Sequence, residues 1–547
     1  MPDGPATSST LALDRLTSAQ RDAVTSHDDR LAVFAGAGAG KTRVLTLRVA
    51  RMVDEGVDPA HILVVTFSRK AAQELRTRLW RLDVEGVRSG TFHRTALELL
   101  EVHRSQQGLA PPQLITDRRR MIERQLSKSP ATRQTNTGMI ADTEISWGKS
   151  WGLNPVSYLD AAARSQRRPA PGIDAVAEIW SVYETAKRRQ GMLDFDDLII
   201  DATKALEDPQ FAAAIHWRSR HVLVDEFQDV NQMQCRLVER LLTPSTSLFC
   251  VGDPNQSIYG FNGADPNLLR HLEDRISGTR IITLDANHRS TPEIVEAATG
   301  VLPLADQRAI STTQAPGAVP EILAFDDDRS EAAFTATKAR DLHGPGGRWR
   351  SIAILARTNA QLTIVAEELQ AAGIPSEPLA PELRPASDLA VAPDRSRQPM
   401  PAATPSDAVA LGTFHRAKGL EWPYVIVIGA SDGLVPHAGA TSDAALDEER
   451  RLLYVALTRA ERDLTVTWSR RRDSSSGQRG SARRRSPFLD PLERSINAMK
   501  ATRRPTSSKT GAAKVAELRR QLDEARAQRA DADETTQAGP PMTLFEG

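Results

Sequence analysis

The segment from Ala35 to Thr42 is rich in glycine and alanine and ends in a lysine and a threonine. The apolar run at residues 31–34 predicts a short buried strand before it, and residues 43–53 have a helical pattern. Glycines on such a strand-to-helix turn let backbone N–H groups converge on a phosphate, where the helix N-terminus adds positive potential. Lys41 can reach the outer phosphates, and the Thr42 hydroxyl can hold Mg²⁺. The alternative is an ordinary turn of small residues, and Ala35 replaces the glycine that is usual at the first position. The residues expected around the nucleotide phosphates are Ala35, Gly36, Ala37, Gly38, Ala39, Gly40, Lys41, Thr42 and Arg43.

Two acids end another apolar run, at residues 221–226. A carboxylate at the end of a buried strand can hold Mg²⁺, usually through water, as we expect of Asp225. Its neighbour Glu226 can polarise an attacking water as a general base. The alternative is an acid pair that caps the next helix. Gln256 follows a further strand, at residues 248–251, and can sense a terminal phosphate through its amide.

Gln20 lies a short step before the phosphate loop. Its side-chain amide offers a donor and an acceptor, which can recognise an adenine edge. A plain surface position is the alternative, but the location ahead of the loop favours adenine recognition and hence ATP.

Several strand ends combine an aromatic residue with a hydroxyl or a cation. Such a mixture can stack on the bases and hold the phosphates of a single strand of nucleic acid. For an isolated phenylalanine, such as Phe67 or Phe92, a place in the core is the more common alternative. The residues concerned are Thr66, Phe67, Arg69, Thr91, Phe92, His93, Tyr259 and Phe261.

A large α/β protein must position these segments, because strands and helices alternate along most of the chain. A chain of 547 residues is too long for a single hydrophobic core, so two to four domains are expected. Lys+Arg 70 balances Asp+Glu 70, and the net charge therefore says nothing about nucleic acid. Cys235 and Cys250 exclude a disulfide framework or a zinc cluster. Neither a signal segment nor a bilayer-spanning run is apparent, so we expect a cytoplasmic protein without a membrane partner.

The alternation stops at residues 101–191, which are polar, helical in pattern and rich in arginine. This composition predicts an inserted helical subdomain, in which Trp147, Trp151 and Trp180 could form a separate small core. Its arginines can follow a nucleic-acid backbone, although charge clusters are more often solvated faces. They are Arg118, Arg119, Arg120, Arg124, Arg133, Arg164, Arg167 and Arg168.

Taken in order, these motifs resemble the superfamily 1A DNA helicases of the UvrD/Rep/PcrA type. The resemblance covers about residues 11–470, and the shared order of motifs is far more specific than any one of them. The matching segments lie at residues 16–20, 35–42, 66–72, 90–93, 225–229, 252–264, 284–290, 355–359, 412–422 and 448–460.

The resemblance implies two RecA-like P-loop NTPase domains with parallel sheets and ATP bound in the cleft between them. Residues 281–284, 352–355 and 424–428 are predicted strands of the second sheet. Arg289 and Arg459 would reach the terminal phosphate, Arg459 as an arginine finger, and Glu421 would accept from the ribose. The implied catalytic set is Lys41, Asp225, Glu226, Gln256, Arg289 and Arg459. Further DNA contacts are implied for Arg357, Asn359, Thr413 and His415.

Three features depart from the family pattern. His288 stands where a tyrosine usually stacks on adenine, so nucleotide binding is expected to be weaker or more pH-dependent. Phe261 and Asn262 replace a tryptophan and an arginine, which keeps base stacking and loses one contact. The helical insertion of the second domain is missing. In its place residues 374–407 are rich in proline, alanine and serine, which predicts an extended linker. In the family that insertion touches duplex ahead of the fork and restrains the motor, so we expect a motor without that restraint.

The expected domain limits follow from these segments. Motor domain 1 takes residues 11–100 and 192–280, the inserted subdomain 101–191, motor domain 2 281–373 and 408–470, and the linker 374–407. Residues 471–547 are predicted to be a basic, mostly disordered tail with a short helix at 514–530, and residues 494–513 a disordered linker within it. Phe488 and Leu489 can dock on the motor. Residues Met542 to Phe545 resemble a short sliding-clamp-binding peptide, a motif with many false positives.

The predicted activity is that of an ATP-dependent 3′–5′ DNA helicase or single-strand translocase in repair or replication. Its partners would be single-stranded DNA and junctions of single- and double-stranded DNA, with ATP and Mg²⁺ as ligands and a monomer as the motor. One alternative is a translocase that strips proteins from DNA or needs a partner to unwind. Another is a DNA-binding scaffold with an inactive ATP site, against which the intact catalytic set argues. A nuclease has no support.

Overall fold

The structure is a computed structural model that describes residues 13–127, 136–379, 406–472 and 481–503. The chain divides into a unit at residues 1–495, which contains two sheets, and a second unit at residues 496–547. Among the described helices, none combines the length and the apolar composition needed to cross a bilayer.

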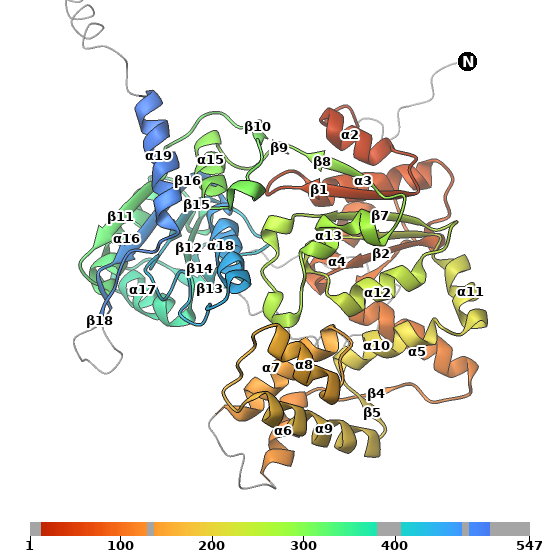
Figure 1. Cartoon of the computed structure of the whole chain (residues 1–547). Coiled ribbons are helices and arrows are strands. Elements are labelled where there is room, and N and C mark those ends of the chain that lie inside the picture. The colour runs from red at the N-terminus through yellow and green to blue at the C-terminus, as the bar shows by residue number, and fades with distance from the viewer. Residues whose placement is uncertain (1–12, 128–135, 380–405, 473–480, 504–547) are drawn as a thin grey trace, which may run out of the picture. The chain divides into compact units, whose positions relative to one another are not determined.

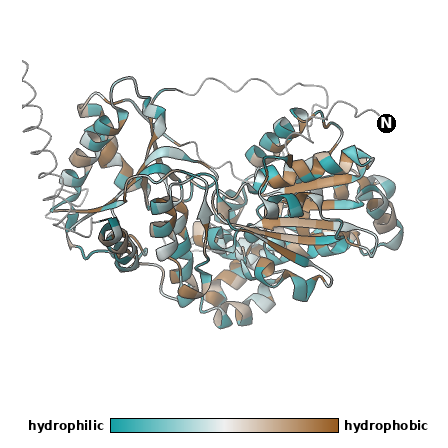
Figure 2. Cartoon of the chain, turned by 90° about the horizontal axis from the view of Figure 1, so that it is seen from above, coloured by the Kyte–Doolittle hydropathy of each residue, from teal (hydrophilic) through white to brown (hydrophobic). Residues whose placement is uncertain are grey.

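The first sheet has six parallel strands in the order β3-β2-β6-β7-β1-β8. Parallel strands covered on both faces consist of nearly continuous apolar runs, and the strands of this sheet are correspondingly hydrophobic in Figure 2. Because all strands point the same way, their carboxyl ends share one edge, where ligands bind in open α/β sheets. The strands are β1 (Arg30–Ala35), β2 (Ile62–Thr66), β3 (Arg88–Thr91), β6 (His221–Val224), β7 (Ser247–Gly252) and β8 (Arg280–Leu284).

Helices cover both faces of this sheet, each over its own apolar cluster. One cluster joins the sheet to α2 (Ser18–Thr25), α3 (Lys41–Asp54) and α4 (Arg69–Trp80). The other joins it to α5 (Phe92–Gln106), α10 (Phe195–Ala205), α11 (Pro209–Arg218), α12 (Gln232–Leu241), α13 (Asn267–Arg270) and α14 (Leu272–Arg275). Short 3₁₀ turns lie at η1 (Pro59–His61), η3 (Phe227–Asp229), η4 (Pro254–Gln256) and η5 (Gly260–Asn262).

Four helices form the inserted subdomain and lie together in Figure 1: α6 (Arg118–Leu126), α7 (Thr137–Ser150), α8 (Pro155–Arg164) and α9 (Ile173–Arg189). The chain enters through β4 (Gln113–Leu114) and leaves through β5 (Met192–Leu193), which pair in parallel. Trp147 and Trp180 belong to a core of its own, as predicted, but Trp151 is 37% exposed and lies outside that core.

Two of the arginines of the insertion form ion pairs inside the protein, whereas Arg120, Arg124, Arg164 and Arg168 are exposed. Arg118 pairs with Asp142 and Asp196, and Arg167 pairs with Glu144. Arg167 therefore forms an ion pair within the subdomain, and Arg118 also joins the subdomain to Asp196 of α10. Arg133 lies outside the described residues.

The second sheet also has six parallel strands, in the order β11-β16-β15-β12-β14-β13. They are β11 (Glu321–Phe325), β12 (Ile352–Ala356), β13 (Ser376–Pro378), β14 (Val409–Thr413), β15 (Trp422–Val427) and β16 (Ala460–Ser469). The helices of this half are α15 (Pro292–Gly300), α16 (Asp328–His343), α17 (Asn359–Ala371), α18 (Asp443–Leu457) and α19 (Leu489–Arg503). Minor elements are β9 (Ala286–Asn287), β10 (Ser311–Thr312), η6 (Leu304–Asp306), η7 (Trp349–Ser351), β17 (Arg471–Arg472) and β18 (Ser481–Ala482). The predicted fold class, two α/β domains with parallel sheets, is confirmed.

One predicted strand belongs to the other sheet. Residues 281–284 were expected in the second sheet, but β8 pairs with β1 at the edge of the first, with Leu31 opposite Arg280 and Ala35 opposite Leu284. An apolar run shows that a strand will be buried and does not show which sheet it joins, because strand partners are chosen by tertiary packing.

Three predictions about less regular segments also change. Part of the predicted linker, residues 376–378, forms β13 at the edge of the second sheet, while residues 380–405 lie outside the described part. Residues 494–503, predicted to be disordered, continue α19, and Phe488 and Leu489 before them are buried, as predicted. Residues 471–472 and 481–482, at the start of the tail predicted to be mostly disordered, form the antiparallel pair β17 and β18. The predicted helix at 514–530 and the clamp-binding peptide at 542–545 lie outside the described residues.

Candidate functional site

The phosphate-binding loop runs from the end of β1 into the first turn of α3. Gly38 and Gly40 have φ angles of 71° and 81°, which favour glycine. A Cβ atom on Gly38 would also lie 2.8 Å from Cβ of Arg289, so that residue approaches the loop directly. Lys41 opens α3 and donates to the carbonyl of Ala35 at 3.4 Å. The strand, turn and helix predicted around this loop are therefore all present.

The segment after β8 lies against this loop. The Asn287 amide donates to the Ala37 carbonyl at 2.8 Å, and the backbone N–H of His288 donates to the Gly38 carbonyl at 2.9 Å. A hollow beside the loop is lined by Gly36 and Asp253. The loop thus contacts residues far from it in sequence, including the neighbour of Arg289.

Gln20 and His288, the two predicted adenine contacts, meet although they are far apart in sequence. Gln20 is buried at the N-terminus of α2, where Thr17 and Gln20 form a capping box. Its Nε2 donates to the carbonyl of Ala39 at 2.9 Å and lies 3.1 Å from Nε2 of His288. Burial, followed by the charge of Arg43, lowers the pKa of His288. The ring is therefore neutral at neutral pH.

Two adjacent carboxylates follow β6. Burial and then the neighbouring Glu226 raise the pKa of Asp225 to about 7. Burial would also raise the pKa of Glu226, but Lys41 and Lys418 bring it below its usual value. Glu226 has a φ of 51°, a strained conformation that such residues adopt mostly at functional sites. Two side-by-side buried acids next to a lysine fit a site that gains a divalent cation, for which Asp225 and Thr42 would supply the oxygen ligands.

Arg459 enters this region from the second half of the chain and is 1% exposed. Its Nη2 donates to Oε1 of Gln256 at 3.2 Å, and its Nη1 donates to the carbonyl of Leu420 at 3.1 Å. Burial and then the charge of Arg289 lower the pKa of Arg459 to about 9. An arginine so strongly desolvated gains from an anion at this place.

Arg289 is held by the carboxylate that was assigned to the ribose. Its Nε lies 2.6 Å from Oε2 of Glu421, and its Nη1 donates to the carbonyl of Thr458 at 3.2 Å. The structure therefore brings Gln20, Lys41, Asp225, Glu226, Gln256, His288, Arg289, Glu421 and Arg459 into one connected region, although their roles stay predictions.

Lys418 is a residue of this region that sequence reasoning did not single out. Its Nζ lies 2.5 Å from Oδ2 of Asp229 and donates to the Gln256 carbonyl at 2.7 Å. The same Nζ stands 4.9 Å from the ring centroid of Tyr259. Burial raises the pKa of Asp229 to about 7, although Lys418 opposes the shift. The signal available was that Lys418 lies inside the matching segment at residues 412–422; which partners it contacts is a property of the fold.

Four aromatic rings form a row across the two halves. Phe67 stacks on Tyr259 with centroids 5.0 Å apart, Tyr259 meets Phe261 at 6.1 Å, and Phe261 meets His415 at 5.9 Å. Phe261 is 45% exposed. We call Phe67, Tyr259, Phe261 and His415 the aromatic row. Rings of this kind offer faces on which unpaired bases can stack.

The other residues predicted to contact DNA do not belong to the aromatic row. Some are buried in the core, some bond to other residues of the protein, and some lie at the starts of helices. Phe92 is 3% exposed in the first core, which favours the core alternative. Thr66 is buried and donates to the carbonyl of Ser68, and Thr91 caps α5. Arg357 is paired with Glu449. Asn359 is exposed at the start of α17, Arg69 opens α4, and His93 and Thr413 are half-buried.

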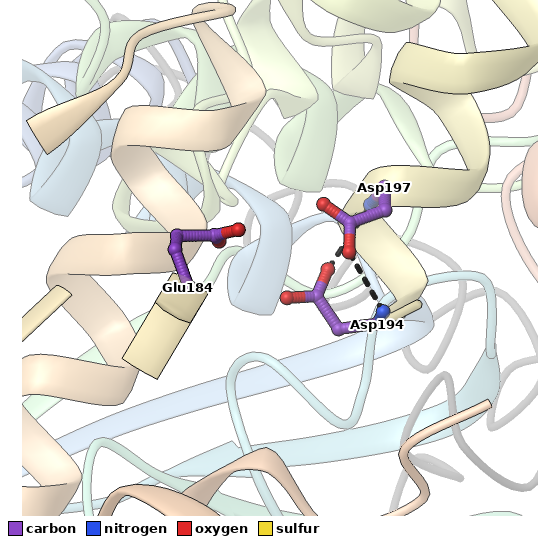
Figure 3. A group of neighbouring side chains, drawn as sticks. All are labelled: Glu184, Asp194 and Asp197. Carbon is purple, nitrogen blue, oxygen red and sulfur yellow. Dashed lines mark hydrogen bonds between the residues drawn. The ribbon is translucent and has the colours of Figure 1, made fainter. Parts of the chain in front are cut away.

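A cluster of acids where the insertion meets α10 resembles a metal site, but two lysines pair with these acids. Oxygen atoms of Glu184, Asp194 and Asp197 gather within 4.8 Å of one another (Figure 3). Lys149 Nζ lies 2.6 Å from Asp194 and 2.7 Å from Asp197, and Lys187 Nζ lies 2.5 Å from Asp197. Two ammonium groups already supply the positive charge, so this is an ion-pair cluster.

Comparison with known proteins agrees with this arrangement. The UvrD/REP helicase N-terminal domain matches residues 16–277, and the UvrD-like helicase C-terminal domain matches residues 282–379 and 395–471. The ATP-dependent DNA helicase UvrD2 of Mycobacterium tuberculosis is 31% identical, over 87% of this chain and 81% of the relative. The putative ATP-dependent DNA helicase YjcD of Bacillus subtilis is 26% identical over the same shares, 87% and 81%. DNA helicase II of Escherichia coli is 32% identical over 66% of this chain and 51% of the relative. The chain therefore belongs to the UvrD/Rep/PcrA family of superfamily 1A and is an ATP-dependent DNA helicase.

Proposed function

We propose that the protein is a motor that moves 3′ to 5′ along single-stranded DNA and separates strands at a junction with duplex. The observation that carries this proposal is the buried contact between Arg459 and Gln256. It joins the second domain to the first beside Lys41 and Glu226, whose charges affect one another. Binding or hydrolysis of the nucleotide would therefore affect residues of both domains at the same time.

Each residue of the site has a task that its surroundings suit. Mg²⁺-bound ATP supplies the phosphoanhydride bond whose hydrolysis drives the cycle. Lys41 and Arg289 neutralise phosphate oxygens, and Arg459, poorly solvated without an anion, stabilises the charge that develops on transfer. Glu226, with a lowered pKa, is ionised at neutral pH and can accept a proton from water.

Lys418 offers a route from the nucleotide to the DNA. It touches Asp229 and Gln256 on the nucleotide side and faces Tyr259 of the aromatic row on the other. Closing and opening of the domains around ATP would move these partners together and shift the strand along the row. Contacts through stacking and phosphate make such movement independent of sequence.

The site assignment is tested by ATP hydrolysis with and without oligo(dT). Lys41→Ala and Arg459→Ala should each lower DNA-stimulated hydrolysis by about a thousandfold, because an arginine finger alone contributes on that scale. Arg119→Ala, which removes an exposed charge on α6, is the matched control and should behave as the parent. DNA-stimulated hydrolysis that persists in Lys41→Ala contradicts the assignment.

The direction is tested with partial duplexes that carry either a 3′ or a 5′ single-stranded tail. A 3′–5′ motor should unwind the duplex with the 3′ tail in an ATP-dependent reaction and leave the other intact. Preference for the 5′ tail would overturn the proposed direction.

A translocase that displaces proteins without unwinding is the second candidate. It is favoured by the short connection between β13 and β14, at residues 379–408, where the family carries a helical insertion. Displacement of streptavidin from biotinylated single strands, without unwinding of a gapped duplex, would support this candidate. We also propose that this chain lacks the restraint that the helical insertion exerts on the motor in the family. Autoinhibited unwinding by the purified monomer would contradict this.

We further propose that the motor works as a monomer in DNA repair or replication within the nucleoid.

A further inference from the structure

Trp151 is a tryptophan with a large exposed face at the end of α7. It is 37% exposed, whereas Trp147 and Trp180 of the same subdomain are 6% and 1% exposed. Its ring leans on Trp147, with centroids 6.2 Å apart and planes at 46°. A large aromatic ring that is left partly in water next to a well-formed core is available to another molecule.

The residues before Trp151 are held rigidly. Lys149 is 3% exposed and pairs with Asp194 and Asp197 of the motor domain, two members of the cluster in Figure 3. Ser150 is buried and donates to the carbonyl of Trp147 at 2.6 Å. The indole is therefore presented from a fixed backbone, so little conformational entropy is lost when a ligand stacks on it.

The end of α7 also touches the turn that carries Phe261. A Cβ atom on Gly263 would lie 1.9 Å from Oγ of Ser150, so the side chain of Ser150 packs directly against the backbone of Gly263. Gly263 follows η5, which contains Phe261, the exposed member of the aromatic row. The helix end that carries Trp151 therefore lies against the turn that carries Phe261.

A cation lies beside Gly152, the residue that follows Trp151. Nη1 of Arg236, on α12, is 3.1 Å from the place that a Cβ atom of Gly152 would take. Arg236 is exposed and, among the residues that the structure describes, forms no ion pair; its guanidinium stands 3.7 Å from Sδ of Met233. An exposed guanidinium next to an exposed indole has the chemistry to hold a phosphate and its base.

We propose that Trp151 and Arg236 form a subsite for one unpaired nucleotide of the DNA strand, with the base on the Trp151 ring and its phosphate on Arg236. The subsite lies at the end of α7, which packs against the turn that carries Phe261. It rests on the proposed function, because the row must carry the strand for a nucleotide to arrive there.

The test compares binding of fluorescein-labelled oligo(dT) by fluorescence anisotropy. Trp151→Ala should weaken binding about tenfold, the loss of one stacked base. Trp151→Phe keeps a ring and should recover most of the affinity. Arg236→Gln should lower the slope of log Kd against log salt by about 0.7, the loss of one phosphate contact on a single strand. Trp217→Ala removes an indole that is 62% exposed on α11 and is the matched control, with binding equal to the parent.

Phe261→Ala separates the two possible failures. If Phe261→Ala weakens binding while Trp151→Ala binds like Trp217→Ala, the subsite is wrong and the proposed DNA path stands. If both variants bind like the parent, the proposed path fails together with the subsite. Should Trp151→Ala not fold, the unmodified protein is irradiated with a 5-iodouracil-substituted single strand and the crosslinked peptides are identified. Crosslinks at Trp151 support the subsite, and crosslinks confined to the aromatic row overturn it.

Discussion

His288 lies beside the phosphate loop, at the position where the family resemblance leads us to expect a tyrosine. Its Nε2 is 3.1 Å from the Gln20 amide, and its Nδ1 is 3.1 Å from the hydroxyl of Thr313. The Gln20 amide group can only donate at this atom, so Nε2 must be the unprotonated acceptor. Protonation of the ring removes that acceptor, and the pKa of His288 is lowered accordingly by burial and by Arg43.

Replacing His288 by tyrosine should strengthen nucleotide binding and remove its pH dependence. A larger ring that stacks on adenine should lower the KM for ATP about two- to tenfold. In the parent the KM should rise as the pH is lowered from about 8 to about 5.5, because the imidazole then gains a proton. Steady-state hydrolysis measured at both pH values checks this. An equal rise of KM in the parent and in His288→Tyr would show that another group titrates.

His415 should make the fold sensitive to acid. Burial, and then Arg357, lowers the pKa of His415 to about 4; Lys418 acts in the same direction and Glu449 opposes it. The unfolded chain takes up the proton near pH 6.5, so this group stabilises the fold above that pH. Its contribution, up to about 3 kcal/mol, is lost as the pH falls from 6.5 towards 4.

His415→Gln removes the titrating group and should reduce the fall of the thermal unfolding midpoint between about pH 7 and about pH 5. His271→Gln, with a side chain 65% exposed, is the control and should keep the parent's dependence. A fall of equal size in His415→Gln and in the parent would contradict the assignment.

At the scale of elements, the ion-pair cluster ties the insertion to the motor domain. Lys149 comes from α7, Lys187 from α9, and Asp194 and Asp197 from the first turn of α10, where they form a capping box. Burial would raise the pKa of Asp194, but Lys149, Arg118 and Lys187 hold it well below its usual range. The carboxylate is thus stabilised only while its cations are in place.

Lys149→Met should destabilise the protein by about 3–5 kcal/mol, because it leaves buried carboxylates without a partner. Arg119→Met breaks an exposed pair with Glu123 and should leave the stability nearly unchanged, because solvent screens such pairs. Urea unfolding measures both. Neither EDTA nor Mn²⁺ should shift the unfolding of the parent through this cluster, and a Mn²⁺-dependent gain that Lys149→Met abolishes would show a metal site after all.

At the scale of the whole molecule, polar side chains of the second domain contact the first domain. Lys418 contacts Asp229, Gln256 and Tyr259, and Arg451 donates to the carbonyl of Ser257 at 2.8 Å. All of these partners lie in the first domain, at the carboxyl edge of its sheet. We therefore expect coupling between ATP and DNA to pass through buried polar contacts of this kind.

Lys418→Met should lower the stimulation of ATP hydrolysis by oligo(dT) about fivefold or more, while hydrolysis without DNA continues. The variant also leaves Asp229 buried without its cation, which costs stability. Lys418→Met combined with Asp229→Asn should regain that stability without regaining stimulation. If stimulation returns in the double variant, the loss came from the unpaired acid and Lys418 is not the link.

The sequence by itself determined what is local or carried by ordered motifs. The phosphate loop needs a strand, glycines at positive φ and a helix, and the sequence of residues 31–53 indicates all three. The position of Lys41 and Thr42 at the start of the helix could therefore be predicted. The parallel sheets followed from apolar strands that alternate with helices. Only the tertiary structure decided the rest. β8 joins the first sheet, Phe92 enters the core, Lys418 reaches Asp229, and Trp151 stays in water, because burial and partners depend on surfaces contributed by distant parts of the chain.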